Sequence, residues 1–141
     1  MKKKFELVSN SEVLSPLRQE LRQLLGLGGW EKKSAEEILL AVDEVLTNII
    51  RHAYGGKPGK MVILFEDSPE KTEIVLEDHG KKFDPTQLPP PELPCHKPDG
   101  LGVHFIRTLM DRVVYDESFK EGNRLHLIKF KSKMLKGERP L

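Results

Sequence analysis

Three polar residues recur at steps of four in EVLTNIIRHAY, residues 44–54: Glu44, Asn48 and His52. Because a helix turns about 100° per residue, this spacing places their side chains along one side of a helix. Asparagine is unusual in a solvated row, since its amide competes with the helical backbone for hydrogen bonds. Its carbonyl oxygen suits Mg²⁺, and a carboxylate one turn away can take a proton. Taken by itself, a surface row with a histidine near the helix C-terminus is the simpler interpretation.

A second group of residues lies in LEDHGKKFDP, where Asp78 ends a β-like run and Gly80 follows it. A carboxylate at the end of a strand can accept a hydrogen bond from an exocyclic amine such as that of adenine. The glycine allows a sharp turn and a close approach to a ligand. An ordinary Asp-x-Gly turn, anchored by Phe83 and ended by Asp-Pro, explains the same residues.

A third group, DGLGVHFIRTLMD, places Gly100 and Gly102 directly before a helical pattern. Free backbone N–H groups at such a position can bind an anion, although two glycines can also simply punctuate the start of a helix. The chain has no Walker P-loop and no Rossmann fingerprint to explain these glycines. Its five histidines and single cysteine show no zinc-binding spacing.

Two predicted helices must position the first group. Residues 11–25 carry an apolar stripe of helical period, and Pro16 fits in the first turn of that helix. Ser34 followed by Glu37 is a capping-box pattern, which predicts a second helix from there to about His52. Its buried stripe is predicted to be Ile38, Val42, Val45 and Ile49, and its solvated face Asp43, Thr47 and Arg51.

The remaining elements are predicted to be strands, a long loop and a third helix. KKKFELV is a first strand, and MVILFED and TEIVLED form a hairpin. Residues 80–100 are rich in Pro, Lys and Gly, and a loop of this length inside a compact domain is usually functional or disordered. VHFIRTLMDRV is a third helix, followed by a second strand pair, VVYDES and RLHLIKFK. This order predicts a single α+β domain over residues 1–141, with antiparallel strands.

Composition excludes several other classes of protein. With 141 residues, 38% apolar and 32% charged, the chain can form one globular domain with a core. A net charge of +1 gives no sign of direct nucleic-acid or membrane binding, and no run approaches the ~18 apolar residues of a membrane span. The N-terminus lacks the apolar run of a signal peptide, and Cys95 is the only cysteine. We therefore expect a cytoplasmic protein without disulfides.

Taken in order, these motifs resemble those of the GHKL (Bergerat-fold) ATPase superfamily. The resemblance rests on E-x-x-x-N-x-x-x-H-A-Y, D-x-G-x-x-F-D-P, G-L-G and G-N-x-L-x-L-x-K. It covers residues 5–131 and is closest to the stand-alone anti-sigma regulatory factors, which are serine-protein kinases of bacterial partner-switching systems. It implies a two-layer α/β sandwich, in which helices cover a mixed, mostly antiparallel sheet. The loop at about residues 80–100 would be the lid.

The resemblance also implies roles for individual residues. It makes Glu44 the general base, Asn48 the Mg²⁺ ligand, Asp78 the adenine-reading carboxylate and Gly80 the residue that makes room for the base. A larger set would contact the nucleotide: His52, Phe83, Gly100, Leu101 and Gly102. Arg18, on the first helix, would orient the base or the phosphates.

These roles imply an ATP- and Mg²⁺-dependent serine kinase that also sequesters a sigma factor. Its substrate would be an anti-anti-sigma (STAS-type) protein, and a homodimer is implied by the resemblance alone. The alternative is a non-catalytic nucleotide-binding regulator of the same family that controls a partner such as a phosphatase. Two departures from the family pattern, Asp99 near the expected phosphates and Lys81–Lys82 after Gly80, bear on nucleotide affinity.

Overall fold

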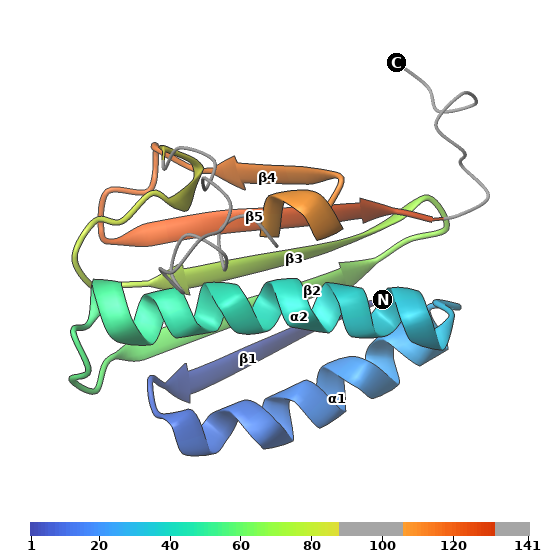
Figure 1. Cartoon of the computed structure of the whole chain (residues 1–141), viewed down its shortest axis with the longest axis horizontal. Coiled ribbons are helices and arrows are strands. Elements are labelled where there is room, and N and C mark those ends of the chain that lie inside the picture. The colour runs from blue at the N-terminus through green and yellow to red at the C-terminus, as the bar shows by residue number, and fades with distance from the viewer. Residues whose placement is uncertain (88–105, 132–141) are drawn as a thin grey trace, which may run out of the picture.

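The computed structural model describes residues 1–87 and 106–131, except the side chain of Ser11. Its helices are α1 (Leu14–Leu27) and α2 (Lys32–Asn48), with short helical segments η1 (Ser11–Val13), η2 (Ile49–Ala53) and η3 (Pro85–Gln87). Its strands are β1 (Lys2–Val8), β2 (Lys60–Asp67), β3 (Lys71–Asp78), β4 (Arg112–Tyr115) and β5 (Asn123–Phe130). Figure 1 shows the strands as one layer and α1 and α2 as a second layer in front of it.

The strands form one sheet in the order β1-β2-β3-β5-β4, and each neighbouring pair is antiparallel. Phe5 pairs with Ile63, Ile63 with Leu76, and Leu76 with Leu125, so one row of buried apolar side chains crosses four strands. Side chains alternate between the faces of a sheet, and this row lies on the face that the helices cover. The predicted α+β sandwich is confirmed, and its described strands are antiparallel throughout.

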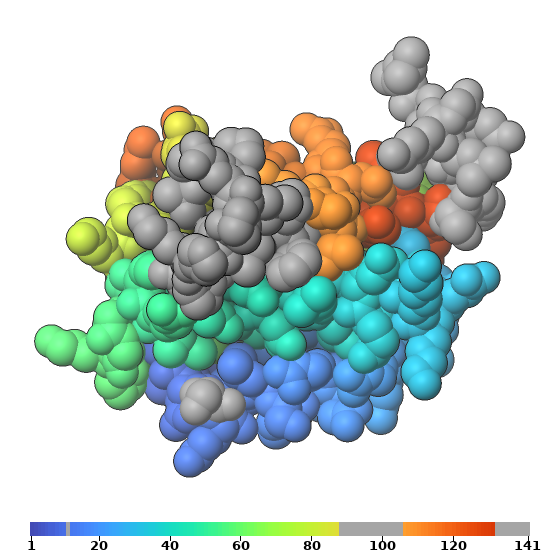
Figure 2. Space-filling view, in the orientation of Figure 1, coloured from blue at the N-terminus to red at the C-terminus, as the bar shows by residue number. Residues whose placement is uncertain are grey.

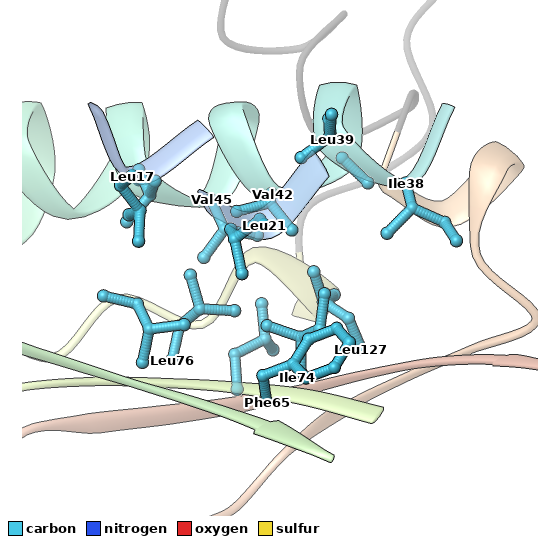
Figure 3. Close-up of a cluster of buried hydrophobic side chains, with 14 of the residues drawn as sticks. Leu17, Leu21, Ile38, Leu39, Val42, Val45, Phe65, Ile74, Leu76 and Leu127 are labelled. Carbon is cyan, nitrogen blue, oxygen red and sulfur yellow. The ribbon is translucent and has the colours of Figure 1, made fainter. Parts of the chain in front are cut away.

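The core fills the space between the two layers. Figure 3 shows side chains from both helices pointing toward side chains of the sheet. The predicted apolar stripe of the second helix is confirmed, because the side chains of Ile38, Val42, Val45 and Ile49 are all buried. On α1 the buried positions are Leu17, Leu21 and Leu25. Pro16 is the third residue of α1, where its missing N–H removes no helical hydrogen bond.

The helices also differ from prediction at their ends. α2 begins at Lys32, and no side-chain hydrogen bond caps it, so the predicted capping box of Ser34 and Glu37 is wrong. Glu31 has extended backbone angles and its carbonyl accepts the N–H of Ala35 at 2.9 Å, which starts the helix earlier. The described part of the third helix ends at residue 109, because β4 already begins at Arg112.

Two ion pairs connect the helices on the surface. Arg18 Nε lies 2.9 Å from Asp43 Oδ2, and Arg22 Nε lies 2.8 Å from Glu36 Oε2. The space-filling view shows α1 and α2 as adjacent bands across this face (Figure 2). Among the described residues, no helix is long and apolar enough to cross a membrane.

A partly buried polar cluster, the Lys131 cluster, ties the end of β5 to the α1–α2 loop. Lys131 Nζ donates to the carbonyl of Gly28 at 2.5 Å and lies 2.9 Å from Asp67 Oδ1. Asp67 Oδ1 also accepts the hydroxyl of Thr72 at 2.6 Å, and Thr72 Oγ1 accepts the indole N–H of Trp30 at 2.7 Å. The cluster therefore joins β2, β3 and β5 to the loop between the helices.

Candidate functional site

A pocket lies where the end of α2, the end of β3 and the start of β5 come together. It brings Asn48, Asp78 and Phe83, which are far apart in the sequence, to one place. The rest of its lining is mostly apolar: Val45, Ile49, Ala53, Leu76, Pro85, Tyr115, Asn123 and Leu125. An apolar pocket with a few convergent polar groups is the usual form of a small-molecule site.

The end of the second helix is wound more widely than an α-helix. From Ile49 to Ala53 it is a π-helix, and the N–H of Tyr54 donates to the carbonyl of Ile49 at 3.0 Å. The prediction of an unbroken α-helix to His52 is therefore wrong in its last turn. Single π-helical turns are rare and often occur at functional sites. Here the turn directs the Ala53 carbonyl toward the N–H of Lys81, which donates to it at 2.7 Å.

Gly80 is required by this contact. A Cβ atom at residue 80 would lie 2.4 Å from the carbonyl oxygen of Ala53, which is closer than any side chain allows. The chain after β3 thus turns directly against the end of the π-helix. The predicted use of Gly80 for a close approach agrees with this geometry, although the neighbour it approaches here is backbone.

Asp78 is a buried carboxylate at the end of β3, with 1% of its surface exposed. Its Oδ1 accepts the backbone N–H of Gly80 at 2.8 Å and the side-chain amide of Asn123 at 2.9 Å. Burial raises the pKa of Asp78, and the hydrogen bonds from Asn123 and Gly80 oppose that rise. No hydrogen bond to Oδ2 is formed by the described residues, so this oxygen can accept one from a ligand.

Asn48 lines the helix side of the pocket, and only 6% of its surface is exposed. Its Nδ2 atom is buried and has no hydrogen-bond partner among the described residues. An unsatisfied buried amide costs free energy. A ligand atom that accepts a hydrogen bond from Asn48 Nδ2 would offset that cost. Buried as it is, Asn48 is no part of a plain surface row.

The two neighbours of Asn48 in the predicted row have different surroundings. His52 is half-buried and its ring stacks on Phe83, with centroids 4.7 Å apart and planes 18° from parallel. Glu44 is half-buried one turn before Asn48 and is not among the described residues that line the pocket. The structure thus brings His52 and Phe83 together, whereas Glu44 lies one turn earlier on α2 and outside the lining of the pocket.

Arg18 binds the neighbour of Glu44 instead. Its guanidinium donates to both carboxylate oxygens of Asp43, at 3.3 Å and 2.9 Å. The prediction that Asp43 belongs to a plain solvated face is therefore wrong, because α1 covers that part of α2. The role of Arg18 toward a nucleotide stays a prediction.

The predicted phosphate-binding residues Gly100, Leu101 and Gly102 lie outside the described residues, as do Asp99 and residues 88–100 of the predicted lid. The lysines after Gly80 are described. The side chain of Lys82 donates to the carbonyls of Phe119, at 2.6 Å, and Gly122. This lysine ties the turn after β3 to the turn before β5 and carries positive charge near Asp78.

Asn123 is a site residue that stands in a motif of the sequence but was assigned no role there. It is 6% exposed at the start of β5 and makes four hydrogen bonds. Its Nδ2 donates to Asp78 Oδ1 and to the carbonyl of Lys81 at 2.8 Å, and its Oδ1 accepts the N–H of Phe83 at 2.9 Å and the hydroxyl of Tyr115 at 2.6 Å. Its sequence signal was the motif G-N-x-L-x-L-x-K, which begins at Gly122.

The donor set fits a nucleotide with Mg²⁺ better than a metal held by protein alone. Among the described residues, no group of three or more His, Cys, Asp or Glu side chains could hold a metal ion. Mg²⁺ bound with phosphates usually takes only one or two protein ligands and keeps several waters. An amide carbonyl such as that of Asn48 is the type of oxygen that such a site uses, and a carboxylate oxygen such as Asp78 Oδ2 is suited to the amine of a base.

The fold and the pocket together define a class of protein. The family model described as histidine kinase-like ATPase domain matches residues 7–129, and the chain belongs to this family. Serine-protein kinase RsbW of Bacillus cereus (strain AH187) is 29% identical to it over 119 residues, which cover 77% of this chain and 74% of that relative. RsbW of Bacillus cereus (strain G9842) and of Bacillus thuringiensis subsp. konkukian (strain 97-27) match with the same identity and coverage.

Proposed function

We propose that this protein is an ATP-dependent serine-protein kinase that acts as an anti-sigma factor in a bacterial partner-switching system. One observation carries the proposal: Asn48 and Asp78, from a helix and a strand, meet in one pocket of a histidine kinase-like ATPase domain. The similarity to proteins named serine-protein kinase RsbW supports the choice of a serine as the phosphate acceptor.

The residues of the pocket would divide the work of binding. Asp78 Oδ2 accepts the exocyclic amine of adenine, while Gly80 keeps the turn after β3 free of a side chain. Apolar residues on β3 and β5, Leu76 and Leu125, contact the base and exclude water. The carbonyl oxygen of Asn48 would hold Mg²⁺, which would neutralise phosphate charge when bound.

The chemical step needs a proton acceptor near the attacking serine. Glu44 lies one turn before Asn48 on α2, and we assign it the role of taking the proton of the serine hydroxyl. Phosphoryl transfer depends mainly on positioning and on charge neutralisation. The proposal therefore asks one side chain to accept the proton, in addition to the groups that bind the nucleotide.

The protein partners follow from the same proposal. The acceptor is a serine of an anti-anti-sigma protein of the STAS type, and the second partner is a sigma factor that the kinase sequesters. Phosphorylation would prevent the anti-anti-sigma protein from displacing the sigma factor. We further propose a cytoplasmic location, where all three proteins would meet.

The test combines binding with transfer. Purified protein is titrated with ATP in a calorimeter, with and without millimolar Mg²⁺, and then incubated with labelled ATP and an anti-anti-sigma protein. We expect Mg²⁺-dependent binding and label on one serine of the partner. Binding without transfer to any tested partner would refute the kinase, and absence of binding to both ATP and ADP would refute the nucleotide site itself.

A further inference from the structure

The most heavily bonded side chain near the pocket is Asn123, which no predicted role explains. It lies directly opposite Asp78 in the register of β3 and β5. Both side chains are almost fully buried, and a buried polar side chain that has all its hydrogen bonds holds one orientation. Its four bonds reach Asp78, the Lys81 carbonyl, the Phe83 N–H and Tyr115.

These bonds fix which oxygen of Asp78 faces a ligand. The Asn123 amide and the Gly80 N–H both donate to Oδ1, so Oδ1 is used and the carboxylate cannot rotate without losing both bonds. Oδ2 is left as the acceptor. Asn123 also holds the backbone at Lys81 and Phe83, which forms the edge of the pocket that follows Asp78.

Resting on the nucleotide-binding function proposed above, we propose that Asn123 is a positioning residue that holds the Asp78 carboxylate as an oriented acceptor and thereby selects a 6-aminopurine over a 6-oxopurine base. Adenine presents an N–H donor at position 6, which matches a carboxylate oxygen. Guanine presents a carbonyl oxygen there, and two acceptors repel each other. The discrimination therefore depends on Asp78 staying ionised and oriented.

Burial disfavours the ionised form of Asp78. It raises the pKa of Asp78, whereas the Asn123 amide lowers it by bonding to the charged form. Within residues 1–87 and 106–131, the other groups that interact electrostatically with Asp78 are His79 and Lys82, which also favour the ionised form, and the hydroxyls of Tyr54 and Tyr115. If the Asn123 donor is removed, a larger fraction of Asp78 is protonated at a given pH. A protonated carboxyl can donate to the oxygen of guanine.

Two variants test this. Asn123→Asp keeps the size and the two acceptor contacts but replaces the donor to Asp78 by a second carboxylate. Asn123→Ala removes the donor without adding charge. In both, we expect the ratio of GTP to ATP dissociation constants to fall by about tenfold, and the pH at which ATP binding is lost to rise by about one unit. Unchanged values of both quantities in folded variants would overturn the proposal.

Tyr54→Phe is the matched control. The Tyr54 hydroxyl accepts the N–H of His79 at 2.8 Å and donates to the Lys60 carbonyl at 2.5 Å, so its loss loosens the same turn without removing a donor to Asp78. We expect Tyr54→Phe to lower thermal stability. The ratio of GTP to ATP dissociation constants and the pH at which ATP binding is lost should stay the same. If Tyr54→Phe changes these as much as the Asn123 variants do, Asn123 is a structural residue only.

A third measurement needs neither a variant nor a nucleotide. In the NMR spectrum of the wild-type protein, the Nδ2 protons of Asn123 should shift with pH in step with the carboxyl carbon of Asp78. A flat Asn123 signal across that titration would overturn the proposal. Should the wild-type protein bind no nucleotide, the proposed function fails, and this titration still decides whether Asn123 holds Asp78.

Discussion

Asp78 and Asn123 face each other across the central strand pair and share a hydrogen bond of 2.9 Å between Oδ1 and Nδ2. The bond lies where β3 ends and β5 begins. The π-helix of residues 49–53 ends beside the same strand ends. It connects the Asp78 carboxylate, for which we propose a role in reading the base, with the backbone at the edge of the pocket. The alignment of β3 and β5 thus decides which side chains lie together at this end of the pocket.

The roles of Glu44 and Asn48 can be separated by substitution. Glu44→Gln keeps size and helix propensity but cannot take the serine proton, so we expect nucleotide binding to persist and turnover to fall by about 10²–10⁴. Asn48→Ala removes a hard oxygen ligand, so Mg²⁺-dependent binding should weaken together with turnover. Calorimetry and partner phosphorylation measure the two properties.

Circular dichroism on both variants checks that α2 is intact. Near-normal phosphorylation by Glu44→Gln would remove Glu44 as the base. If Asn48→Ala also left phosphorylation and Mg²⁺-dependent binding unchanged, both residues would have a structural role only.

Gly80→Ala should destabilise the fold. The new Cβ would lie 2.4 Å from the Ala53 carbonyl, so either the π-helix or the turn after β3 must move, at a cost of about 1–3 kcal/mol. Gly26→Ala is the control, because it is in α1 with no atom within 4 Å of the added Cβ. There we expect a gain of about 0.5–1 kcal/mol. Urea unfolding compares the two, and equal effects would contradict the packing argument.

Because the pKa of Asp78 is raised, we expect the substitution Asp78→Asn to increase the stability of the fold. The pKa is raised by burial, so the folded chain holds a proton that the unfolded chain has lost between pH ~4 and the raised value, and stability falls as pH increases through that window. Asp78→Asn removes this cost. We expect it to unfold at a higher temperature than wild type at pH 7, with the difference shrinking toward pH 4, and to lose ATP binding.

Asp116 should behave in the opposite way. Hydrogen bonds from Ser118 and Arg124 lower its pKa to about 2, so its stabilising contribution is present above pH ~4 and is lost as pH falls toward 2. Asp116→Asn should therefore unfold at a lower temperature than wild type at pH 7, with little difference at pH 2–3. If both substitutions changed the unfolding temperature in the same direction at pH 7, burial would not be what sets the pKa of Asp78.

The Lys131 cluster should carry a large share of stability. Lys131→Met leaves the partly buried Asp67 carboxylate without its cation, so the loss should exceed the ~1 kcal/mol of an exposed pair and stay below the ~3–5 kcal/mol of a fully buried one. Lys2→Met is the control, because Lys2 and Glu66 are exposed and 3.9 Å apart, and such pairs contribute about 0–1 kcal/mol. Urea unfolding of both variants measures the difference. A loss below about 1 kcal/mol for Lys131→Met would contradict this view.

Much of the fold follows from local pattern. Alternation of apolar residues predicted the hairpin of β2 and β3, and helical spacing predicted the buried faces of α1 and α2. The start of α2 did not follow, because Ser34 and Glu37 satisfy a capping pattern while the backbone at Glu31 begins the helix earlier. The π-helical turn was also missed, since no residue pattern marks a helix that widens by one residue.

The site followed from the sequence only in part. Asn48 and Asp78 belong to recognisable motifs, and the structure brings them to one pocket. Asn123 also stands in one of these motifs, but its role could not be found that way, because its contact with Asp78 depends on how β3 and β5 align. The pairing of Arg18 with Asp43 was missed for a similar reason, since it depends on how α1 crosses α2.

The position of β1 at the edge of the sheet affects how the chain folds. β1 pairs with β2, although both helices lie between them in the sequence, and β3 pairs with β5 rather than with the next strand. Such distant pairings favour slow folding, on the order of milliseconds to seconds. During synthesis β1 stays unpaired until β2 has been made. Its three lysines, Lys2, Lys3 and Lys4, disfavour pairing with strands of other chains during that interval.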